Sequence, residues 1–548
     1  MEGGLLQCSA NYMPLSPISF LEGAATVYGG KVSIVYGTTT YSWRQTHERC
    51  LKMASALFQL GISRGDIVVA LAPNVPALYE LHFSVPMAGA VLSALNTRLD
   101  SATLALILEQ LEAKMIFVDY QFVEVVLEAF NHLSHKKGNL PPLVLVPECD
   151  QASSSMAKEP PQGSLDYNRL IAMGQSGFEI KHPNSECDPI SVNYTSGSTG
   201  KPKGVIYSHR AVYLKSLGEI LRSDMRHLPV FLWTVDMFRC NGWCFPWAVA
   251  AVGGTNICLR NVSAKAIFDA ISLHKVTHLC GAPTLLSMIA EAIPTHHRPL
   301  PHKVDIVVAG AVPPSQVLNK IQELGFNLTH AYGMTEALGP VIASELSSLN
   351  ENSKFKHREG IHALTMEGVD VKNPTTMTSV PCDGETIGEV MLRGNTMMLG
   401  YFKNLQATQE ALRGGWYRTG DLGVVHPDGH IQMKDRAIDK IISGGETIST
   451  LEVEAVLVSH PMVSEAAVVG RPDDHLGETP CAFVKLKDGC NVSSEEIIEF
   501  CGKRLSRYMA PRTVYFGDLP VNSTGKVQKF VLREKAKAKG CLSLYNRD

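Results

Sequence analysis

The sequence has no hydrophobic run long enough to cross a lipid bilayer. Its most apolar segment, Phe245 to Val252, is far shorter than the ~20 residues of a membrane-spanning helix, and glycines follow it directly. The net charge is −3, and no basic patch interleaved with aromatic residues occurs. We therefore expect no membrane span and no nucleic-acid partner.

Recognisable targeting signals are also missing. The stretch 1–8 has neither a charged leader nor a long apolar run, and the final residues Tyr545 to Asp548 differ from a Ser-Lys-Leu peroxisomal signal. The 13 cysteines are an odd number scattered along the chain, which is typical of reduced thiols. Cys240 and Cys244 lack a second pair or nearby histidines to complete a zinc site, so we expect core thiols in a cytosolic protein.

A chain of 548 residues is too long for a single core, so two or more domains are expected. Up to about residue 435, amphipathic helix patterns such as Trp43 to Gly61 alternate with buried strand patterns such as Asp66 to Leu71. Leu78 to Val85 is expected to be a helix stopped by Pro86, whereas Glu351 to Val380 is polar and predicted to be irregular. The alternation predicts an α/β fold of mostly parallel, helix-covered sheets.

The pattern changes after about residue 437. Strand-like runs at Glu465 to Val469 and Ala482 to Leu486 are followed by a helix expected over Ser493 to Leu505, with its own capping signal. This order is typical of a small α+β domain. We predict an N-terminal domain at 1–435, a hinge at 436–440 and a mobile C-terminal lid at 441–548.

One stretch, Tyr194 to Val205, concentrates glycine, hydroxyl and lysine side chains in the order Tyr-Thr-Ser-Gly-Ser-Thr-Gly-Lys-Pro-Lys-Gly-Val. Glycines let backbone amides approach an anion, and hydroxyls and lysines add donors and charge, which favours a phosphate cradle. A flexible linker has no need of lysines between strand-like runs. A Walker A loop needs glycine where Thr195 stands and Ser or Thr where Pro202 stands. The stretch therefore indicates a nucleotide loop of another kind.

Further motifs follow this loop in the chain: Tyr332-Gly-Met-Thr-Glu336, Gly415-Trp-Tyr-Arg-Thr-Gly-Asp421, Asp435-Arg436, Ser443-Gly-Gly-Glu446 and Ser523-Thr-Gly-Lys526. In this order they resemble the adenylate-forming, acyl-activating superfamily over essentially the whole chain. The likeness is greatest to plant-type acyl-activating enzymes, which make CoA thioesters of small carboxylic acids. The resemblance implies ATP, Mg²⁺ and CoA as cofactors.

The resemblance also implies a two-step reaction. A carboxylate attacks the α-phosphorus of ATP to give acyl-AMP and pyrophosphate, and the CoA thiol then attacks the acyl carbon and expels AMP. A short- to medium-chain or branched aliphatic acid is the expected substrate, placing the chain in fatty acid metabolism as a monomer or homodimer. A benzoate- or cinnamate-like acid, luciferase-like oxidation of the adenylate and a weakly active or non-catalytic adenylate-binding relative are the alternatives.

Roles for individual residues follow from the same resemblance. The phosphate cradle comprises Thr195, Ser196, Gly197, Ser198, Thr199, Gly200, Lys201 and Lys203. The nucleotide also contacts His330, Ala331, Tyr332, Gly333 and Met334, with Tyr332 stacked on adenine. Thr335 touches the α-phosphate and Glu336 holds Mg²⁺. The turns at His278 to Pro283 and Asp305 to Gly310, where strands end, are expected to wall the acid and adenine pocket.

The C-terminal motifs complete this set. Asp421 is expected to accept both ribose hydroxyls, because a carboxylate offers two acceptor oxygens to a vicinal diol. Arg436 contacts ribose or phosphate, and Lys526 bridges the attacking carboxylate and the α-phosphate as negative charge develops there. The residues expected beside the path of the pantetheine thiol are Ser443, Gly444, Gly445 and Glu446.

Two positions depart from the family pattern. Arg239 stands where related sequences have a histidine in a Met-Phe-His-x-Asn-Gly-Trp motif, and Ile438 stands where they have Asp or Lys at the hinge. An arginine at this position is always charged and can bind a carboxylate bidentately, so we expect it to act in the acid pocket. The alternative is that Arg239 turns outward to an acidic partner. The β-branched Ile438 is expected to change the lid equilibrium without preventing rotation.

Overall fold

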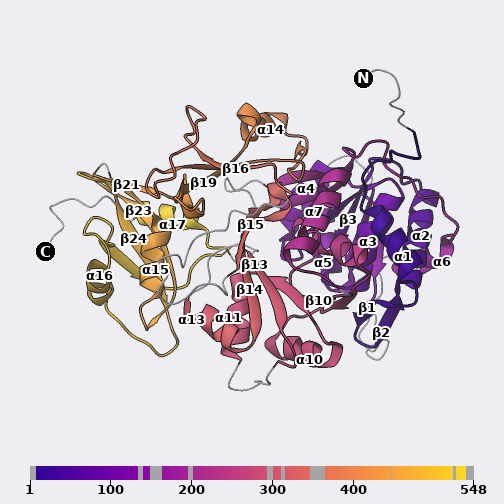
Figure 1. Cartoon of the computed structure of the whole chain (residues 1–548), viewed down its shortest axis with the longest axis horizontal. Helices are drawn as coiled ribbons and strands as arrows, with labels where there is room; N and C mark the ends of the chain where they lie inside the picture. Colours follow the sequence, from indigo (N-terminus) through magenta and orange to yellow (C-terminus); the bar gives the residue numbers. More distant parts are fainter. Residues whose placement is uncertain are drawn as a thin grey trace.

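The computed structural model describes residues 8–133, 140–148, 163–195, 202–226, 228–292, 300–309, 315–345, 365–444, 446–521 and 526–538. Within these residues the chain forms an α/β architecture of four sheets, with the N-terminal part (indigo) and the C-terminal part (yellow) at opposite ends of the molecule (Figure 1). Two sheets have eight strands each, one has four, and one has five.

The first large sheet carries the start of the glycine-rich stretch. Its strand order is β18 (Gly400–Tyr401), β9 (Lys203–Ser208), β8 (Pro189–Thr195), β4 (Val91–Ala94), β3 (Ile67–Leu71), β5 (Met115–Asp119), β6 (Leu143–Val146) and β7 (Leu165–Asp166). From β8 to β7 the pairs are parallel, whereas β8, β9 and β18 pair in antiparallel fashion. The antiparallel register sets Thr195 opposite Lys203 at the ends of β8 and β9.

The second large sheet carries the Tyr332 motif on a strand near its edge. Its order is β15 (Gly339–Glu345), β14 (Phe326–Met334), β13 (Val304–Ala309), β12 (His278–Gly281), β10 (Val230–Trp233), β11 (Thr255–Cys258), β1 (Val32–Tyr36) and β2 (Thr39–Ser42). The pairs at the two edges, β15 with β14 and β1 with β2, are antiparallel, and the other pairs of this sheet are parallel. The helix–strand alternation therefore predicted these parallel-rich sheets correctly.

Helices fill the space between the two large sheets and cover their outer faces. The shared core includes α1 (Ile18–Val27), α2 (Trp43–Gln59), α3 (Pro76–Met87), α7 (His209–Arg222) and α9 (Phe245–Ala251). The outer layers contain α4 (Ser101–Leu111) and α5 (Val123–Leu133) on the first sheet, and α10 (Ala264–His274), α11 (Pro283–Glu291) and α13 (Ser315–Glu323) on the second. Both large sheets are buried on two faces, as parallel sheets require.

The two smaller sheets follow in sequence. The four-stranded antiparallel sheet contains β16 (Gly368–Lys372), β17 (Gly388–Arg393), β19 (Tyr417–Val425) and β20 (Ile431–Arg436). The five-stranded sheet contains β22 (Glu446–Ile448), β21 (Ile441–Ser443), β24 (Gly477–Leu486), β23 (Val463–Asp473) and β25 (Thr513–Phe516). It packs with α15 (Thr450–Val458), α16 (Ser494–Gly502) and α17 (Lys529–Ala538) around apolar clusters of its own. We use the word lid for residues 441–548.

Two local predictions about the N-terminal part are wrong. The helix expected over Leu78 to Val85 begins at Pro76 and continues through Pro86 to Met87. Pro76 occupies the first turn, where its missing N–H breaks no helical bond, and Pro86 falls in the last turn. The region predicted to be irregular over 351–380 contains the strand Gly368–Lys372, which pairs with β17. Residues 351–364 of that region lie outside the described residues.

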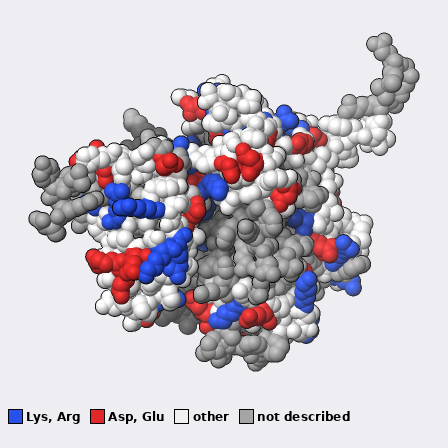
Figure 2. Space-filling model, turned by 60° about the vertical axis from the view of Figure 1, so that its left-hand side comes forward, with Lys and Arg blue, Asp and Glu red and all other residues white. Residues whose placement is uncertain are grey.

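The lid elements match the sequence patterns more closely. The expected strands fall within β23 and β24, and α16 begins with the capping box formed by Ser493 and Glu496. The helix ends at Gly502, three residues before Leu505. In the part of the chain that the structure describes, no helix has the length and apolar character needed to cross a membrane. On the face shown in Figure 2, blue and red side chains are interspersed.

Candidate active site

Tyr332, Asp421 and Arg436 come together from two different sheets. Tyr332 lies near the end of β14, and its hydroxyl donates a hydrogen bond of 2.7 Å to Oδ2 of Asp421 on β19. Asp421 pairs in register with Arg436 on β20, and the Arg436 Nε atom lies 3.4 Å from Oδ1 of Asp421. Three residues that the sequence assigned to the nucleotide are thus in direct contact.

The protonation of this group follows from its burial. Burial raises the pKa of Tyr332 well above its ordinary value, and the neighbouring Asp421 charge adds to the effect. Burial also raises the pKa of Asp421, while Arg436 and the Tyr332 hydroxyl act in the opposite direction. Near neutral pH the tyrosine therefore keeps its proton and acts as the donor to the carboxylate.

Lys526 approaches the same place from the lid. Its side chain is exposed to solvent, yet the protein around its amino group lowers its pKa by desolvation, and Arg436 lowers it further. Asp421 and Cys240 act in the opposite direction, so both lie within electrostatic range of the Lys526 ammonium group. The lid position in this structure therefore presents Lys526 to the Asp421 side of the site.

Thr335 and Glu336 follow β14 directly and are held by two tyrosines. The Tyr207 hydroxyl on β9 donates to the Thr335 carbonyl oxygen at 2.6 Å, which links the two large sheets at this point. The Tyr401 hydroxyl donates to Oε1 of Glu336 at 2.9 Å. The Lys203 ammonium lies 4.8 Å from the centroid of the Tyr401 ring, so the described end of the glycine-rich stretch is beside Glu336.

Glu336 is the candidate magnesium ligand among these site residues. Among the described residues, no group of three or more His, Cys, Asp or Glu side chains gathers into a metal site. Glu336 nevertheless suits Mg²⁺, because this ion is bound by one or two carboxylates together with phosphate oxygens and water. Its carboxylate accepts from Tyr401 and has further lone pairs to offer.

The rest of the Tyr332 motif forms the strand itself. His330 and Ala331 pair with Val308 and Ala309 of β13, and Met334 ends β14. A Cβ atom on Gly333 would lie 2.0 Å from the Gly339 carbonyl oxygen, so only glycine fits at this position. The close approach of β14 and β15 at Gly333 explains why the motif contains glycine.

Several predicted residues cannot be placed. Ser196, Gly197, Ser198, Thr199, Gly200, Lys201 and Gly445 lie outside the described residues. In the lid, Ser443 pairs with both Glu446 and Gly477, and Gly444 adopts a φ of 58° in the turn that follows β21. These described residues of the Ser443 motif form a turn of the lid sheet.

Arg239 precedes a turn of unusual backbone conformation. From Cys240 to Cys244 every residue has a positive φ, between 41° and 65°. Left-handed backbone costs roughly 1–2 kcal/mol for each residue other than glycine. Buried hydrogen bonds offset this cost: the Ser191 hydroxyl donates to Oδ1 of Asn241 at 2.7 Å, and the Asn241 N–H donates to Oδ1 of Asn193 at 3.0 Å.

The Arg239 side chain pairs with an acid, as the alternative interpretation predicted. Its Nε atom lies 2.8 Å from Oδ2 of Asp236, and Arg98 contacts the same oxygen at 3.0 Å. Arg239 is only 26% exposed, and its charge acts on both Cys240 and Lys526. It therefore lies beside the site and shares the Asp236 carboxylate with Arg98.

Sequence reasoning missed the contact between Cys240 and Thr335. It was expected to be a core thiol, but it is half-buried and its Sγ donates to Oγ1 of Thr335 at 3.4 Å. The left-handed turn directs Cys240 toward the end of β14, and no sequence pattern indicates that direction. Cys244 is buried, in agreement with the prediction.

The hinge prediction falls on a short connection between sheets. β20 ends at Arg436 and β21 begins at Ile441. Ile438 is exposed, and its carbonyl oxygen accepts from Nη1 of Arg533 at 2.9 Å. The same guanidinium nitrogen lies 2.6 Å from Oδ1 of Asp439. Arg533 of α17 therefore fastens the connection to the helix that follows Lys526.

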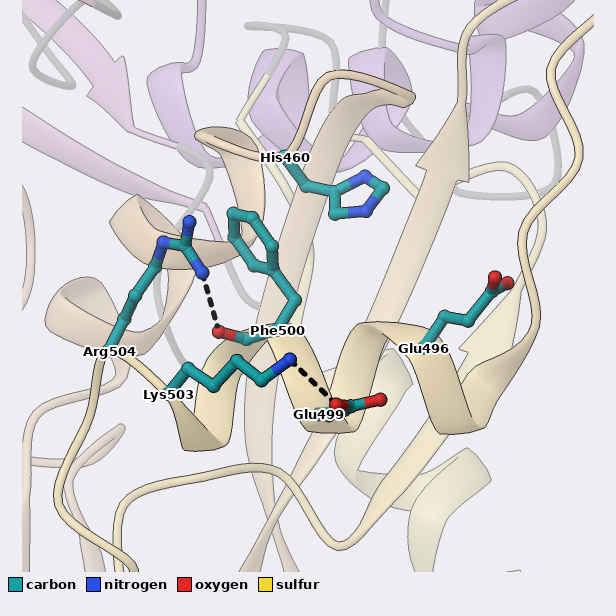
Figure 3. Close-up of a pocket in the computed structure, with 6 residues that line it drawn as sticks. All are labelled: His460, Glu496, Glu499, Phe500, Lys503 and Arg504. Atoms are coloured by element: carbon teal, nitrogen blue, oxygen red, sulfur yellow. Dashed lines mark hydrogen bonds and ion pairs between the residues drawn. The ribbon is translucent and has the colours of Figure 1, made fainter.

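The lid also has a hollow of about 320 Å³ on its surface, away from these residues (Figure 3). It is lined by His460, Glu496, Glu499, Phe500, Lys503 and Arg504. Lys503 pairs with Glu499 at 2.6 Å, and Arg504 donates to the Phe500 carbonyl oxygen at 3.2 Å. Its lining comes from α16 and its neighbours, so none of the predicted site residues contributes to it.

Comparisons with known proteins cover nearly all of the chain. The model of a family described as "AMP-binding enzyme" matches residues 21–402, and that of the "AMP-binding enzyme C-terminal domain" matches residues 452–526. The chain is 47% identical to the "2-methylpropanoate--CoA ligase CCL4" of Humulus lupulus, with 97% of both chains covered. It is 44% identical to the "Trans-cinnamate:CoA ligase, peroxisomal" of Petunia hybrida, covering 99% of this chain and 98% of that protein.

A solved structure has the same fold. The O-succinylbenzoate coenzyme A synthetase of Bacillus subtilis, in complex with ATP and a magnesium ion, superposes with a TM-score of 0.79 at 25% identity. The similarity covers 94% of this chain and 99% of that structure. Both the mixed α/β sheets and the C-terminal domain are therefore common to the two proteins.

Proposed function

Because the chain belongs to the AMP-binding enzyme family, we propose that it is an AMP-forming carboxylate–CoA ligase that activates a short- to medium-chain or branched aliphatic acid through an acyl-AMP intermediate. Its co-substrates are ATP and CoA, with Mg²⁺ as cofactor. The observation that carries this proposal is the convergence of Tyr332, Asp421 and Arg436 with the lid residue Lys526.

In the first step the acid's carboxylate oxygen bonds to the α-phosphorus of ATP, and the bond to pyrophosphate breaks. This chemistry depends on positioning and on cations near the oxygens, with no covalent help from the protein. Lys526 supplies a cation on the Asp421 side of the site, and its ammonium stabilises the charge that develops on the α-phosphate. The Thr335 hydroxyl and Arg436 hold the α-phosphate and the ribose.

Asp421 binds the ribose. Tyr332 and Arg436 each contact one of its oxygens, which fixes the carboxylate plane and leaves lone pairs for the two ribose hydroxyls. Tyr332 and the residues His330 to Met334 contact the adenine. Thr195, Lys203 and the stretch between them hold the β- and γ-phosphates.

Glu336 holds Mg²⁺ beside the phosphate cradle. The bound ion neutralises charge on the phosphate oxygens. Tyr401 orients Glu336 for this role through its hydroxyl, and the Lys203 ammonium lies over the Tyr401 ring. Tyr401 thus connects the proposed metal ligand Glu336 to Lys203 of the phosphate cradle.

In the second step the CoA sulfur bonds to the acyl carbon, and the bond from that carbon to AMP breaks. We propose that the lid, residues 441–548, turns about the hinge at 436–440 relative to residues 1–435. This rotation withdraws Lys526 and brings the segment Ser443 to Glu446 to the thiol path. The contact of Arg533 with Asp439 supports a hinge that is held in a defined position before the rotation.

The aliphatic substrate class is supported by the Humulus lupulus relative, which is named for 2-methylpropanoate. A cinnamate-like acid is the alternative, because the Petunia hybrida relative is named for trans-cinnamate at 44% identity. That relative is also named as peroxisomal, so the proposed cytosolic location needs its own test by imaging the tagged full-length chain.

The test is CoA-dependent AMP release across a panel of aliphatic and aromatic acids. We expect AMP and pyrophosphate in equal amounts, with an aliphatic acid giving the highest kcat/KM. Oxygen consumption in place of CoA consumption would indicate luciferase-like chemistry. ATP binding without pyrophosphate release for any acid would show a non-catalytic adenylate-binding protein.

A further inference from the structure

Three charged residues of α7 form a buried group that the proposed mechanism does not use. Lys215, Glu219 and Arg222 recur at intervals of four and three residues, so they lie on one face of the helix. The Lys215 amino group lies 3.2 Å from Oε1 of Glu219, and Arg222 contacts the other oxygen of that carboxylate. The exposed fractions of the three side chains are 5%, 1% and 12%.

This face of α7 packs against β15 and the left-handed turn that follows Arg239. The Lys215 amino group donates to the carbonyl oxygen of Pro340, two residues into β15 and directly after Gly339, whose backbone packs against Trp243. The thiols of Cys240 and Cys244 on the left-handed turn lie within electrostatic range of Lys215.

The group lies near two segments that are expected to line the acid pocket, the turn after Arg239 and the end of β12. Cys240 is within electrostatic range of Lys215 and also of Lys526, where the adenylate forms. Arg222 lies within electrostatic range of Cys280. Cys280 is near the end of β12, in the turn that is expected to wall the pocket. Cys240 thus lies near both lysines.

Among the described residues, the charges of the group do not balance while Lys215 is protonated. Two cations then share the single carboxylate of Glu219, which leaves one positive charge. Other buried pairs in the described core are one to one, such as Arg49 with Glu80 and Arg260 with Asp119. Burial, together with Arg222, lowers the pKa of Lys215 to about 7. A nearby anion would remove this penalty.

The hydrogen bonds of Lys215 are also incomplete within the described residues. An ammonium group has three donors, whereas the contacts of Lys215 with described residues use two, to Pro340 and Glu219. The third donor and the extra charge together suit one negatively charged oxygen group of a ligand.

We propose that Lys215 forms the far end of the acid pocket and selects a carboxylic acid that carries a second carboxylate distal to the one that reacts. This inference rests on the proposed ligase function and narrows its substrate class. The second carboxylate pairs with Lys215, while the first reacts beside Lys526. Glu219 is a positioning residue that holds Lys215 in place.

The test compares dicarboxylates with uncharged isosteres in the AMP-release assay. Succinate is paired with 4-methylpentanoate, and glutarate with 5-methylhexanoate, because a distal carboxylate and an isopropyl group have similar shapes. In the full-length wild-type enzyme we expect kcat/KM to be at least tenfold higher for one dicarboxylate than for its isostere. Preference for the isosteres in both pairs would overturn the inference.

The matched variant is Lys215→Met, which removes the charge but leaves Glu219 paired with Arg222. We expect it to reverse the preference toward the isostere, while Lys265→Met, at an exposed i,i+4 pair with Asp269, leaves the preference unchanged. An unchanged ratio in Lys215→Met would overturn the inference. If Lys215→Met is insoluble, Lys215→Gln is measured, and the wild-type ratio decides alone if both variants fail to fold.

Different results would contradict the proposed ligase function and the proposed role of Lys215. Turnover of isosteres without a dicarboxylate preference leaves the ligase function standing and removes only the role of Lys215. Failure to release AMP with any acid, including acetate and 2-methylpropanoate, removes the ligase function and the inference with it.

Discussion

Tyr332 donates its hydroxyl proton to Asp421 across a distance of 2.7 Å. The side chain assigned to adenine therefore holds the side chain assigned to ribose. Arg436 contacts the second oxygen of the same carboxylate, so Asp421 is oriented from two sides before ATP binds. The proposed nucleotide site is thus held together by residues that are far apart in the sequence.

Asp421→Ala should raise the KM for ATP, because the ribose loses hydrogen bonds to an ionised acceptor that are worth roughly 1–3 kcal/mol each. The measurement is kcat/KM for ATP, 2′-deoxy-ATP and 3′-deoxy-ATP. The variant should lose discrimination among the three nucleotides. Tyr332→Phe, which keeps the carboxylate, is the control and should retain it. If Asp421→Ala discriminates as strongly as the wild type, Asp421 does not bind the ribose.

Lys526→Ala should slow adenylation on the order of 10²-fold or more, the usual effect of removing one charge-stabilising donor. Pyrophosphate exchange measures this step. Formation of the thioester from pre-made acyl-AMP should be retained much better, because the lid has by then withdrawn the lysine. Lys535→Ala on the exposed side of α17 is the control. Equal losses in both steps would exclude the proposed role.

Arg239→His should keep the fold and change the order of preference among acids. The reason is that Arg239 lies near Lys526 and Cys240 and shares the Asp236 carboxylate with Arg98. Adenylation should change more than ATP binding. The acid panel and ATP titrations measure the two effects. A variant with the same acid preference and the same adenylation rate would show that Arg239 only stabilises its loop.

Arg533→Met should slow adenylation severalfold and leave thioester formation from acyl-AMP nearly unchanged. The substitution removes the contacts with Asp439 and the Ile438 carbonyl oxygen, which hold the hinge in the position seen here. Asp439→Asn removes only the charge and should have a smaller effect in the same direction. Equal slowing of both half-reactions would argue against a role in the lid equilibrium.

His82 should make the protein less stable in mild acid. Burial lowers its pKa to about 4, so between about pH 6.5 and 4 the unfolded state binds more protons than the folded state. The stabilisation is fully present above pH 6.5, and about 3 kcal/mol is lost as the pH falls to 4. Tm measured from pH 7.5 to 4.5 should fall less in His82→Gln than in the wild type. The exposed His132→Gln should match the wild type.

The motifs named residues that the structure brings into contact, Tyr332, Asp421 and Arg436, but gave no signal for the residues around Lys215. Tyr332, Asp421 and Lys526 each belong to short sequence signatures. Their meeting depends on how β14, the antiparallel strand β19 and the lid pack together, which the signatures do not encode. Lys215 and Glu219 have the spacing of an ordinary surface pair on a helix. The packing of α7 against α9 and β9, together with the contact between Lys215 and β15, buries them. Helical periodicity does not report which neighbour covers a face.

The sequence predicted some of the local backbone structure and missed the rest. The helix over Trp43–Gln59 follows from its capping box and apolar face, whereas the strand Gly368–Lys372 lies in a polar stretch and is stabilised by pairing with β17. The left-handed turn at Cys240 depends on hydrogen bonds from Ser191 and Asn193, which are about fifty positions away in the chain. Long-range contacts of this kind leave no periodic signal.

In the left-handed turn, some residues set the path of the backbone, and their neighbours make the side-chain contacts with the site. Asn241 and Gly242 define the path of the backbone, through buried amide bonds and a glycine that packs against Trp233. Arg239 and Cys240 occupy that path and contact Asp236 and Thr335 with their side chains. The side chains of Arg239 and Cys240 take no part in the hydrogen bonds of Asn241. Substitutions at these two positions are therefore expected to change the surroundings of Asp236 and Thr335 without removing the bonds that support the turn.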